Sequence, residues 1–283
     1  TDMISTYSSS TGFGTTPTAT FFNKPTSTET ITFQFRFLGS ETLSISLPLT
    51  EATGGSFTSA DTVTILGTSY PLADGLTFSI TNPNAIPTFI DVVVQVQKGF
   101  VASLGGWTGD AQNRLTSASA SNSSTSTNWG FGVDDDGNPG LTSLYQGFEN
   151  CDELISVPAY LPVTVTTLKE CFKSSYTFNQ SINLWNTSNV TDMEGTFEYA
   201  SAFNGDISSW DVSNVTTLKK LFTNSSFDQD IGSWDISNVL DLDNTFSYCP
   251  FNQDIGFWNT SNVTTMNQLF DNNSTFRQDV RSW

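Results

Sequence analysis

The chain has 283 residues, of which 28 are acidic and 10 are basic, so its formal net charge is -18 at pH 7. A protein that binds nucleic acid or an anionic membrane needs clustered basic side chains, and here they cluster only at Lys219 and Lys220, so the composition argues against both partners. The absence of histidine removes the commonest general base near neutral pH, the serine and cysteine triads and most zinc sites.

Residues 1–29 are rich in Ser, Thr, Gly and Pro and show little periodicity. This composition is typical of a loosely ordered terminus, a linker or an extended arm. Phe13, Phe21 and Phe22 favour an arm that docks on a neighbouring subunit, because exposed aromatic side chains are unusual in a free tail. We therefore expect either a loose terminus or an arm that supports self-association.

Residues 30–103 have the period of two that is typical of half-buried strands. The alternating segments lie near residues 31–37, 43–49, 63–65, 76–80 and 89–97. Short strands separated by Gly, Pro and Asp breakers predict an all-β sandwich or barrel-like domain. Residues 104–140 show neither the strand period nor the helix period and predict a loop-rich junction.

The junction contains one acidic motif that suggests a cofactor. Asp134, Asp136 and Asn138 stand at alternate positions, as the first ligands of a calcium loop do. A proline follows Asn138 where the loop needs glycine, and no glutamate closes the motif, so an acidic turn is the alternative. Ca²⁺ is the only cofactor that the sequence suggests.

Aromatic residues recur after residue 140 at intervals of 24 or 25 residues. The repeated tryptophans are Trp185, Trp210, Trp234, Trp258 and Trp283. Three further columns keep the same interval: Phe172, Phe197, Phe222, Phe246 and Phe270; Phe178, Phe203, Phe227, Phe251 and Phe276; and Ile182, Ile207, Ile231, Ile255 and Val280. A degenerate first repeat begins near Leu141, because Phe148 precedes Phe172 by 24 residues. Residues 141–283 therefore predict a repeat solenoid of about five to six units.

Each unit combines two local patterns. Val190, Met193 and Phe197 have the spacing of one helical face, and Thr191 with Glu194 fits a capping box at the start of such a helix. The polar segment at residues 203–210 is short, as one strand per coil would be. We therefore expect a strand and a short helix in each unit, with the aromatic columns stacked into one core.

The sequence motif that the units share, FNQDIG-W--SNVTTM--LF, resembles the roughly 25-residue lipoprotein-type repeat of BspA-like leucine-rich-repeat surface proteins of bacteria and mycoplasmas. The resemblance covers about residues 141–283; the first unit lacks the tryptophan and is expected to cap the core. It implies a secreted or surface-anchored protein associated with adhesion rather than catalysis. The fold we expect is mixed, an N-terminal all-β sandwich or barrel-like domain followed by a leucine-rich-repeat-like α/β solenoid.

Two repeat columns could carry function. The tryptophans could form a ladder that stacks on sugar rings, but we favour a core position because they share the register of the Phe and Ile columns. The acidic column consists of Asp206, Asp230, Asp254 and Asp279. Like charges at the spacing of neighbouring strands repel each other, so the column either binds a divalent cation or a cationic partner, or caps its own turns.

Asparagine forms a further column at Asn189, Asn214, Asn238 and Asn262. Three of these residues also begin Asn-x-Ser/Thr sequons, but the repeat favours side chains that bond to the turn of a coil. The sequons in loop-like segments are better glycosylation candidates, namely Asn122, Asn224, Asn272 and Asn273.

The cysteines Cys151, Cys171 and Cys249 are too few for a disulfide framework. Cys151 and Cys249 both follow a column phenylalanine by three residues, where we expect buried free thiols. A bridge between Cys151 and Cys171, which lie in adjacent units, is the alternative.

We interpret the chain as an extracellular or particle-surface structural protein, placed outside the cell, on a cell surface or on a virion or filament surface. Its repeats would serve self-association or would bind a surface protein or glycan; a monomeric adhesin or glycan-binding module is the alternative. No catalytic residue stands out, and a carbohydrate-active enzyme with paired carboxylates is the less favoured reading. No segment has the apolar length of a membrane span.

Overall fold

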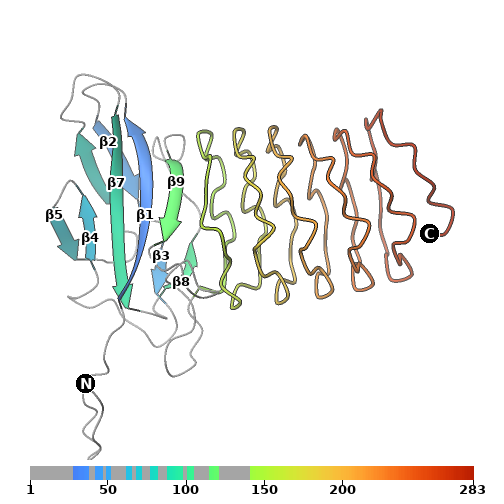
Figure 1. The fold of residues 1–283 in the computed structure, drawn as a ribbon, viewed down its shortest axis with the longest axis horizontal. Helices are drawn as coiled ribbons and strands as arrows, with labels where there is room; N and C mark the ends of the chain where they lie inside the picture. Colours follow the sequence, from blue (N-terminus) through green and yellow to red (C-terminus); the bar gives the residue numbers. More distant parts are fainter. Residues whose placement is uncertain are drawn as a thin grey trace, which may run out of the picture.

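The computed structural model describes residues 28–37, 42–46, 49–51, 62–65, 68–71, 77–81, 88–97, 101–104, 115–120 and 141–283. Strands occupy the first nine of these ranges, and a series of stacked coils occupies the last (Figure 1). Asn122 and the proposed calcium ligands Asp134, Asp136 and Asn138 lie outside the described residues, as does almost all of the N-terminal arm.

The strands before the coils pair in three antiparallel groups. They are β1 (Thr28–Phe37), β2 (Thr42–Ser46), β3 (Leu49–Glu51), β4 (Thr62–Ile65), β5 (Thr68–Pro71), β6 (Thr77–Thr81), β7 (Thr88–Gln97), β8 (Val101–Leu104) and β9 (Leu115–Ala120). Five of them form one sheet in the order β5-β4-β7-β1-β9, while β2 pairs with β6 and β3 pairs with β8.

Strand β1 lies inside the five-stranded sheet and pairs with β7 over its whole length, from Thr28 opposite Gln97 to Phe37 opposite Thr88. Phe33 and Phe35 are fully buried, so the apolar face of the alternating pattern supplies core side chains as period-two burial requires.

Strand β9 lies within the segment that was expected to be loop-rich. It pairs with β1, and a register shift between Gln34 and Phe35 inserts one extra residue into β9. The bulge places Leu115 and Ala118, three residues apart, opposite Phe35 and Phe33, and both are buried. A bulge of this kind breaks the period of two, which is why the alternation rule missed this strand.

The coils of residues 141–283 are bonded each to the next. Parallel bridges join equivalent residues of successive coils, namely Ser143, Thr167, Asp192, Thr217, Asp241 and Thr265. Every second amide near each bridge donates to the following coil, as Met193 N–H does to Thr217 O at 3.3 Å and Phe197 N–H to Leu221 O at 3.0 Å. Several intervening amides donate to a carbonyl three residues earlier. The coils therefore share one ladder of backbone hydrogen bonds.

The prediction of a short helix in each unit is wrong for the described residues, which contain no helix. The segment that follows Val190 forms consecutive turns, and Gly195 and Tyr199 have φ of 60° and 61°, far from the right-handed helical region. Val190, Met193 and Phe197 are nevertheless buried. Successive turns bring these side chains to the core at a spacing that a helix would also produce.

The predictions of a strand at residues 203–210 and of a capping box at Thr191 and Glu194 are also wrong. Residues 203–210 contain no strand, and the bridges lie elsewhere in the coil. The Thr191 hydroxyl donates to Thr166 O in the preceding coil at 3.2 Å, and the amide of Glu194 donates to the Asp192 carboxylate at 2.9 Å. These polar side chains bond within and between turns rather than at a helix end.

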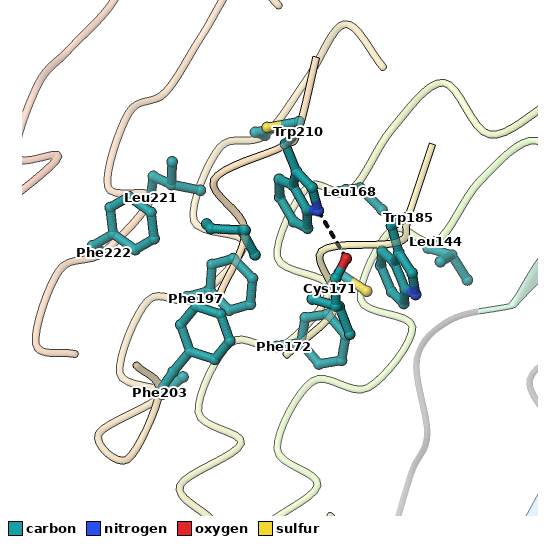
Figure 2. Packing of buried hydrophobic residues seen from close by; sticks show 14 of the residues in the cluster. Leu144, Leu168, Cys171, Phe172, Trp185, Phe197, Phe203, Trp210, Leu221 and Phe222 are labelled. Atoms are coloured by element: carbon teal, nitrogen blue, oxygen red, sulfur yellow. Dashed lines mark hydrogen bonds between the residues drawn. The ribbon is translucent and has the colours of Figure 1, made fainter. Parts of the chain in front are cut away.

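Stacked aromatic rings fill the inside of the coils (Figure 2). In one column the ring centroids of Phe172 and Phe197 lie 5.5 Å apart, and those of Phe197 and Phe222 lie 5.9 Å apart. Each of these phenylalanines also stacks on a ring of the second column within its own coil, as Phe197 does on Phe203 at 3.7 Å. Fully buried rings in contact along the stack supply much of its hydrophobic stabilisation.

The two ends of the stack differ. At the first coil, the amide of Ala118 in β9 donates to Ser156 O at 2.9 Å, so this strand lies against the unit that was expected to cap the core (Figure 1). In the last coil Phe270 and Phe276 are only partly buried. No helix in the described part of the chain is long and apolar enough to cross a lipid bilayer.

Candidate functional site

The tryptophan column lies in the core. Trp185, Trp210, Trp234 and Trp258 are all less than 5% exposed, and the indole N–H of Trp210 donates to Ile182 O of the preceding coil at 3.0 Å (Figure 2). Their faces are covered by neighbouring rings, so these four residues cannot stack on a sugar. The core assignment is confirmed.

The acidic column caps its own turns. Each carboxylate accepts a hydrogen bond from the amide two residues later: Asp206 from Ser208, Asp230 from Gly232 and Asp254 from Gly256, all at 2.9 Å, and Asp279 from Arg281 at 3.1 Å. This is the turn-capping arrangement that the sequence offered beside cation binding. Within the described residues, no three His, Cys, Asp or Glu side chains are grouped so that they could hold a metal ion.

The asparagine column ties each coil to the one before it. The side-chain amides donate to backbone carbonyls: Asn189 to Val163 at 2.8 Å, Asn214 to Ser188 at 2.8 Å, Asn238 to Ser213 at 2.7 Å and Asn262 to Ser237 at 2.6 Å. The prediction that these side chains bond the turn of a coil is confirmed.

The glycosylation candidates in the described coils differ in their surroundings. The Asn273 amide donates to Phe251 O at 2.9 Å in a partly buried position, which argues against its modification. Asn272 is exposed, and its amide donates to Asp271 at 2.9 Å. Asn224 is half-buried and has a left-handed backbone with φ of 56°. Of the three, Asn272 has the most accessible side chain.

All three cysteines are free and buried. Burial raises the pKa of the Cys249 thiol to about 11, and it raises those of Cys151 and Cys171 well above the usual value. These thiols are therefore protonated and unreactive near neutral pH. The alternative of a bridge between Cys151 and Cys171 is wrong in this structure.

A charge cluster that the sequence analysis missed lies across four successive coils. Lys173 Nζ is 2.9 Å from Glu170, 3.4 Å from Glu198 and 4.0 Å from Glu149, and Lys220 Nζ is 3.3 Å from Glu198. Glu198 is 5% exposed, so its carboxylate depends on the two lysines. Glu149, Lys173 and Glu198 occupy one repeat column. The alternation of negative and positive charge along that column is the sequence feature from which the cluster could have been predicted.

The cluster shifts the pKa values of its members in different directions. Burial raises the pKa of Glu149. Burial also acts to raise the pKa of Glu170, but the hydrogen bonds from Lys173 and Gln146 outweigh it and the pKa lies below its ordinary value. For Lys173, burial acts to lower the pKa, but the hydrogen bond to Glu170 and the surrounding carboxylates raise it.

We expect Lys173→Met to lower the free energy of unfolding at pH 7 by about 1 kcal/mol, because charge-assisted hydrogen bonds are lost while Lys220 still pairs with Glu198. The depressed pKa of Glu170 means that its stabilisation is present above the unfolded-state pKa of about 4.3 and is lost as pH falls through the folded value. The raised pKa of Glu149 has the opposite effect on stability, because its protonation on acidification favours the folded state. Urea titrations from pH 3 to 7 should show that the variant loses less stability on acidification than the wild type.

Lys219→Met is the matched control, because Lys219 lies next to the cluster in the chain and forms none of its ion pairs. It should change stability by less than about 0.5 kcal/mol. Equal pH dependence in Lys173→Met and the wild type would show that Lys173 does not set the pKa of Glu170.

Comparison with known proteins gives one family. The family model described as "Mycoplasma protein of unknown function, DUF285" matches residues 142–250 and, in a second overlapping match, residues 223–283. Neither the curated proteins nor the solved structures contain a match. The matched residues are those of the stacked coils.

Proposed function

The chain belongs to the DUF285 family, whose model covers residues 142–283, and from this membership and the geometry of the coils we propose that it is a surface-exposed structural protein of the BspA-like kind. Its coils form a leucine-rich-repeat-like solenoid without helices, which presents outward side chains to a partner in adhesion. The partner would be a glycan or a protein outside the cell.

One observation carries this proposal: inward positions repeat while some outward positions vary. The core column Phe172, Phe197, Phe222 and Phe246 is the same residue in four coils, and all four are fully buried. A second column reads Asn150, Ser174, Tyr199, Asn224, Tyr248 and Asn272, and all of its members except the buried Ser174 are half-buried or exposed. A constant core under a variable surface suits a rigid scaffold whose specificity lies outside, as in other repeat proteins.

Labelling of intact producing cells tests the surface location. A membrane-impermeant biotin reagent that reacts with amines should label the protein, because Lys219 and Lys220 are partly exposed. Labelling only after lysis would contradict a surface protein. A cytoplasmic protein labelled only in lysed cells serves as the control for membrane integrity.

Self-assembly is the second candidate. Leu184 and Phe257 lie in the same outward column and are 62% and 90% exposed, and contact with a second copy would bury them. Light scattering of the intact chain over a concentration series separates the two candidates. A constant monomer mass favours adhesion, and a mass that rises with concentration favours self-assembly.

A further inference from the structure

Two columns of the coils hold residues with a left-handed backbone: one consists of Gln146, Glu170, Gly195, Lys220, Asn244 and Gln268, and the other contains two tyrosines. The members of this other column are Asn150, Ser174, Tyr199, Asn224, Tyr248 and Asn272, with φ between 53° and 61°. Asparagine adopts this conformation readily, whereas a bulky aromatic residue does so only against a steric penalty. Tyr199 and Tyr248 therefore stand where the repeat otherwise prefers small polar residues, and a strained residue that persists points to function.

The side chains of these tyrosines are exposed and have no partner among the residues that the structure describes. Tyr199 is 44% exposed and Tyr248 is 55% exposed, and Tyr176, at the same corner of the preceding coil, is 48% exposed. The Ala202 amide donates to Tyr176 O at 3.2 Å, which holds the corners of these two coils together. Within the described residues, none of the three rings stacks on another ring, and none of their hydroxyls has a hydrogen-bond partner.

The residues at the corner around the tyrosines are themselves uncharged, although Lys173, Glu198 and Asp271 lie directly beside them in the chain and the Arg277 guanidinium donates to Ser274 O at 2.8 Å. We call this corner the tyrosine edge, and it consists of residues 174–177, 199–202, 224–226, 248–250 and 272–275. It contains no Asp, Glu, Lys or Arg, although the chain has 28 acidic residues and a net charge of -18. A cationic partner would be attracted to the acidic columns instead, so this edge suits a neutral ligand.

We propose that the tyrosine edge binds a neutral polysaccharide whose chain lies along the stack of coils. The inference rests on the proposed function, because it assigns a ligand class to the outward face of the scaffold. Tyrosine rings offer flat faces to the C–H groups of sugar rings, and the exposed side chains of Ser201, Ser226 and Asn272 offer donors and acceptors to sugar hydroxyls. Tyr, Ser and Asn are also the residues that dominate adaptable binding surfaces.

The regularity of the edge favours a polysaccharide over a folded protein. Equivalent rings in adjacent coils of the core lie 5.5–6.4 Å apart, and the edge repeats with the same coils. Its tyrosines come from three coils out of four in succession. A linear ligand with a short chemical repeat can contact all of them at once, and this multiplies weak contacts into useful affinity.

Retention of the intact chain on three neutral matrices, microcrystalline cellulose, chitin and mannan-agarose, tests the proposal. We expect the wild type to be retained on at least one of them and the double variant Tyr199→Asn with Tyr248→Asn to bind at least about tenfold more weakly. Asparagine occupies the same column at Asn224, so the double variant should melt at the wild-type temperature or above it. Tyr176→Ser, which copies Ser201 and Ser226 of the neighbouring coils, should weaken binding without placing a new residue in a left-handed position.

Tyr145→Asn is the matched control, because Tyr145 is 46% exposed and lies outside the tyrosine edge; it should bind as the wild type does. Absence of retention on all three matrices, or undiminished binding by both edge variants, would overturn the proposal. If the edge variants lose binding to an immobilised protein and the wild type binds no polysaccharide, the edge binds a protein partner, and this result would also overturn the proposal. Surface labelling is independent of these outcomes, so failure of the ligand class and failure of the surface location can be told apart.

Discussion

Phe197→Ala is expected to lower the free energy of unfolding by about 3–5 kcal/mol, the range for a phenylalanine removed from a close-packed core. The side chain is fully buried, and its ring lies 3.7 Å from Phe203, 5.5 Å from Phe172 and 5.9 Å from Phe222. A cavity there removes contacts in the coil itself and on both of its neighbours. Urea denaturation followed by circular dichroism measures the loss.

Phe276→Ala provides the comparison in the last coil, in the column of Phe203. Phe276 is only partly buried, and it stacks on Phe270 at 3.9 Å and on Phe251 at 6.4 Å. We expect a loss of about 1–2 kcal/mol, because less apolar surface is buried there. Equal losses in the two variants would show that stacking between coils does not add to the stability of the inner ones.

Gly205→Ala should also destabilise the chain, by about 1–3 kcal/mol, because it overpacks a backbone contact between two coils. A Cβ at this position would lie 2.3 Å from Gln180 O and 2.9 Å from Gln180 C. Backbone atoms cannot move away as a flexible side chain does. The coils would have to separate, and the ladder of hydrogen bonds between them would lengthen. Thermal unfolding should show the lower stability.

Gly195→Asn is the control for Gly205→Ala. Gly195 has a φ of 60°, and the equivalent residue Asn244 has a φ of 57°. A Cβ at Gly195 would meet the Glu198 carboxylate at 3.3 Å, which is the end of a flexible side chain. The change should cost less than about 0.5 kcal/mol. A larger loss in Gly195→Asn than in Gly205→Ala would contradict the close approach of the coils at Gly205.

The period of the chain predicted which residues form the core of the repeats. The Phe, Ile and Trp columns are buried in every coil before the last because each interval of 24 or 25 residues returns the chain to the same place in the next coil. The hydrogen bonds of the asparagine column were predicted from the same period. These features could be predicted because they depend on spacing alone, which the sequence states directly.

The local conformation of each coil could not be predicted in the same way. Consecutive turns and a helix both bury residues at spacings of three and four, so the pattern of Val190, Met193 and Phe197 fits both. The difference lies in amides that donate to a coil 24 residues away, as Phe197 does to Leu221, and no local rule contains that bond. Strand β9 was missed for a related reason, because its bulge is fixed by pairing with β1.

The candidate sites also divide into those that follow from the spacing of the repeat and those that depend on contacts between coils. The acidic column was recognised, and its bonds to the following amides show how each carboxylate is used in its own turn. The charge cluster around Lys173 and the tyrosine edge were missed, because both depend on side chains from different coils and on their exposure. Comparison of charge and aromatic content column by column would have found both.

Amide hydrogen exchange, measured by NMR on the intact chain, tests most directly whether residues 141–283 form one stack bonded from coil to coil. The amides of Met193, Gly195 and Phe197 donate to Thr217, Lys219 and Leu221 of the next coil. They should exchange only through large unfolding events and should show protection close to the global stability. Rapid exchange of these three amides under native conditions would contradict the shared ladder and the rigid scaffold that depends on it.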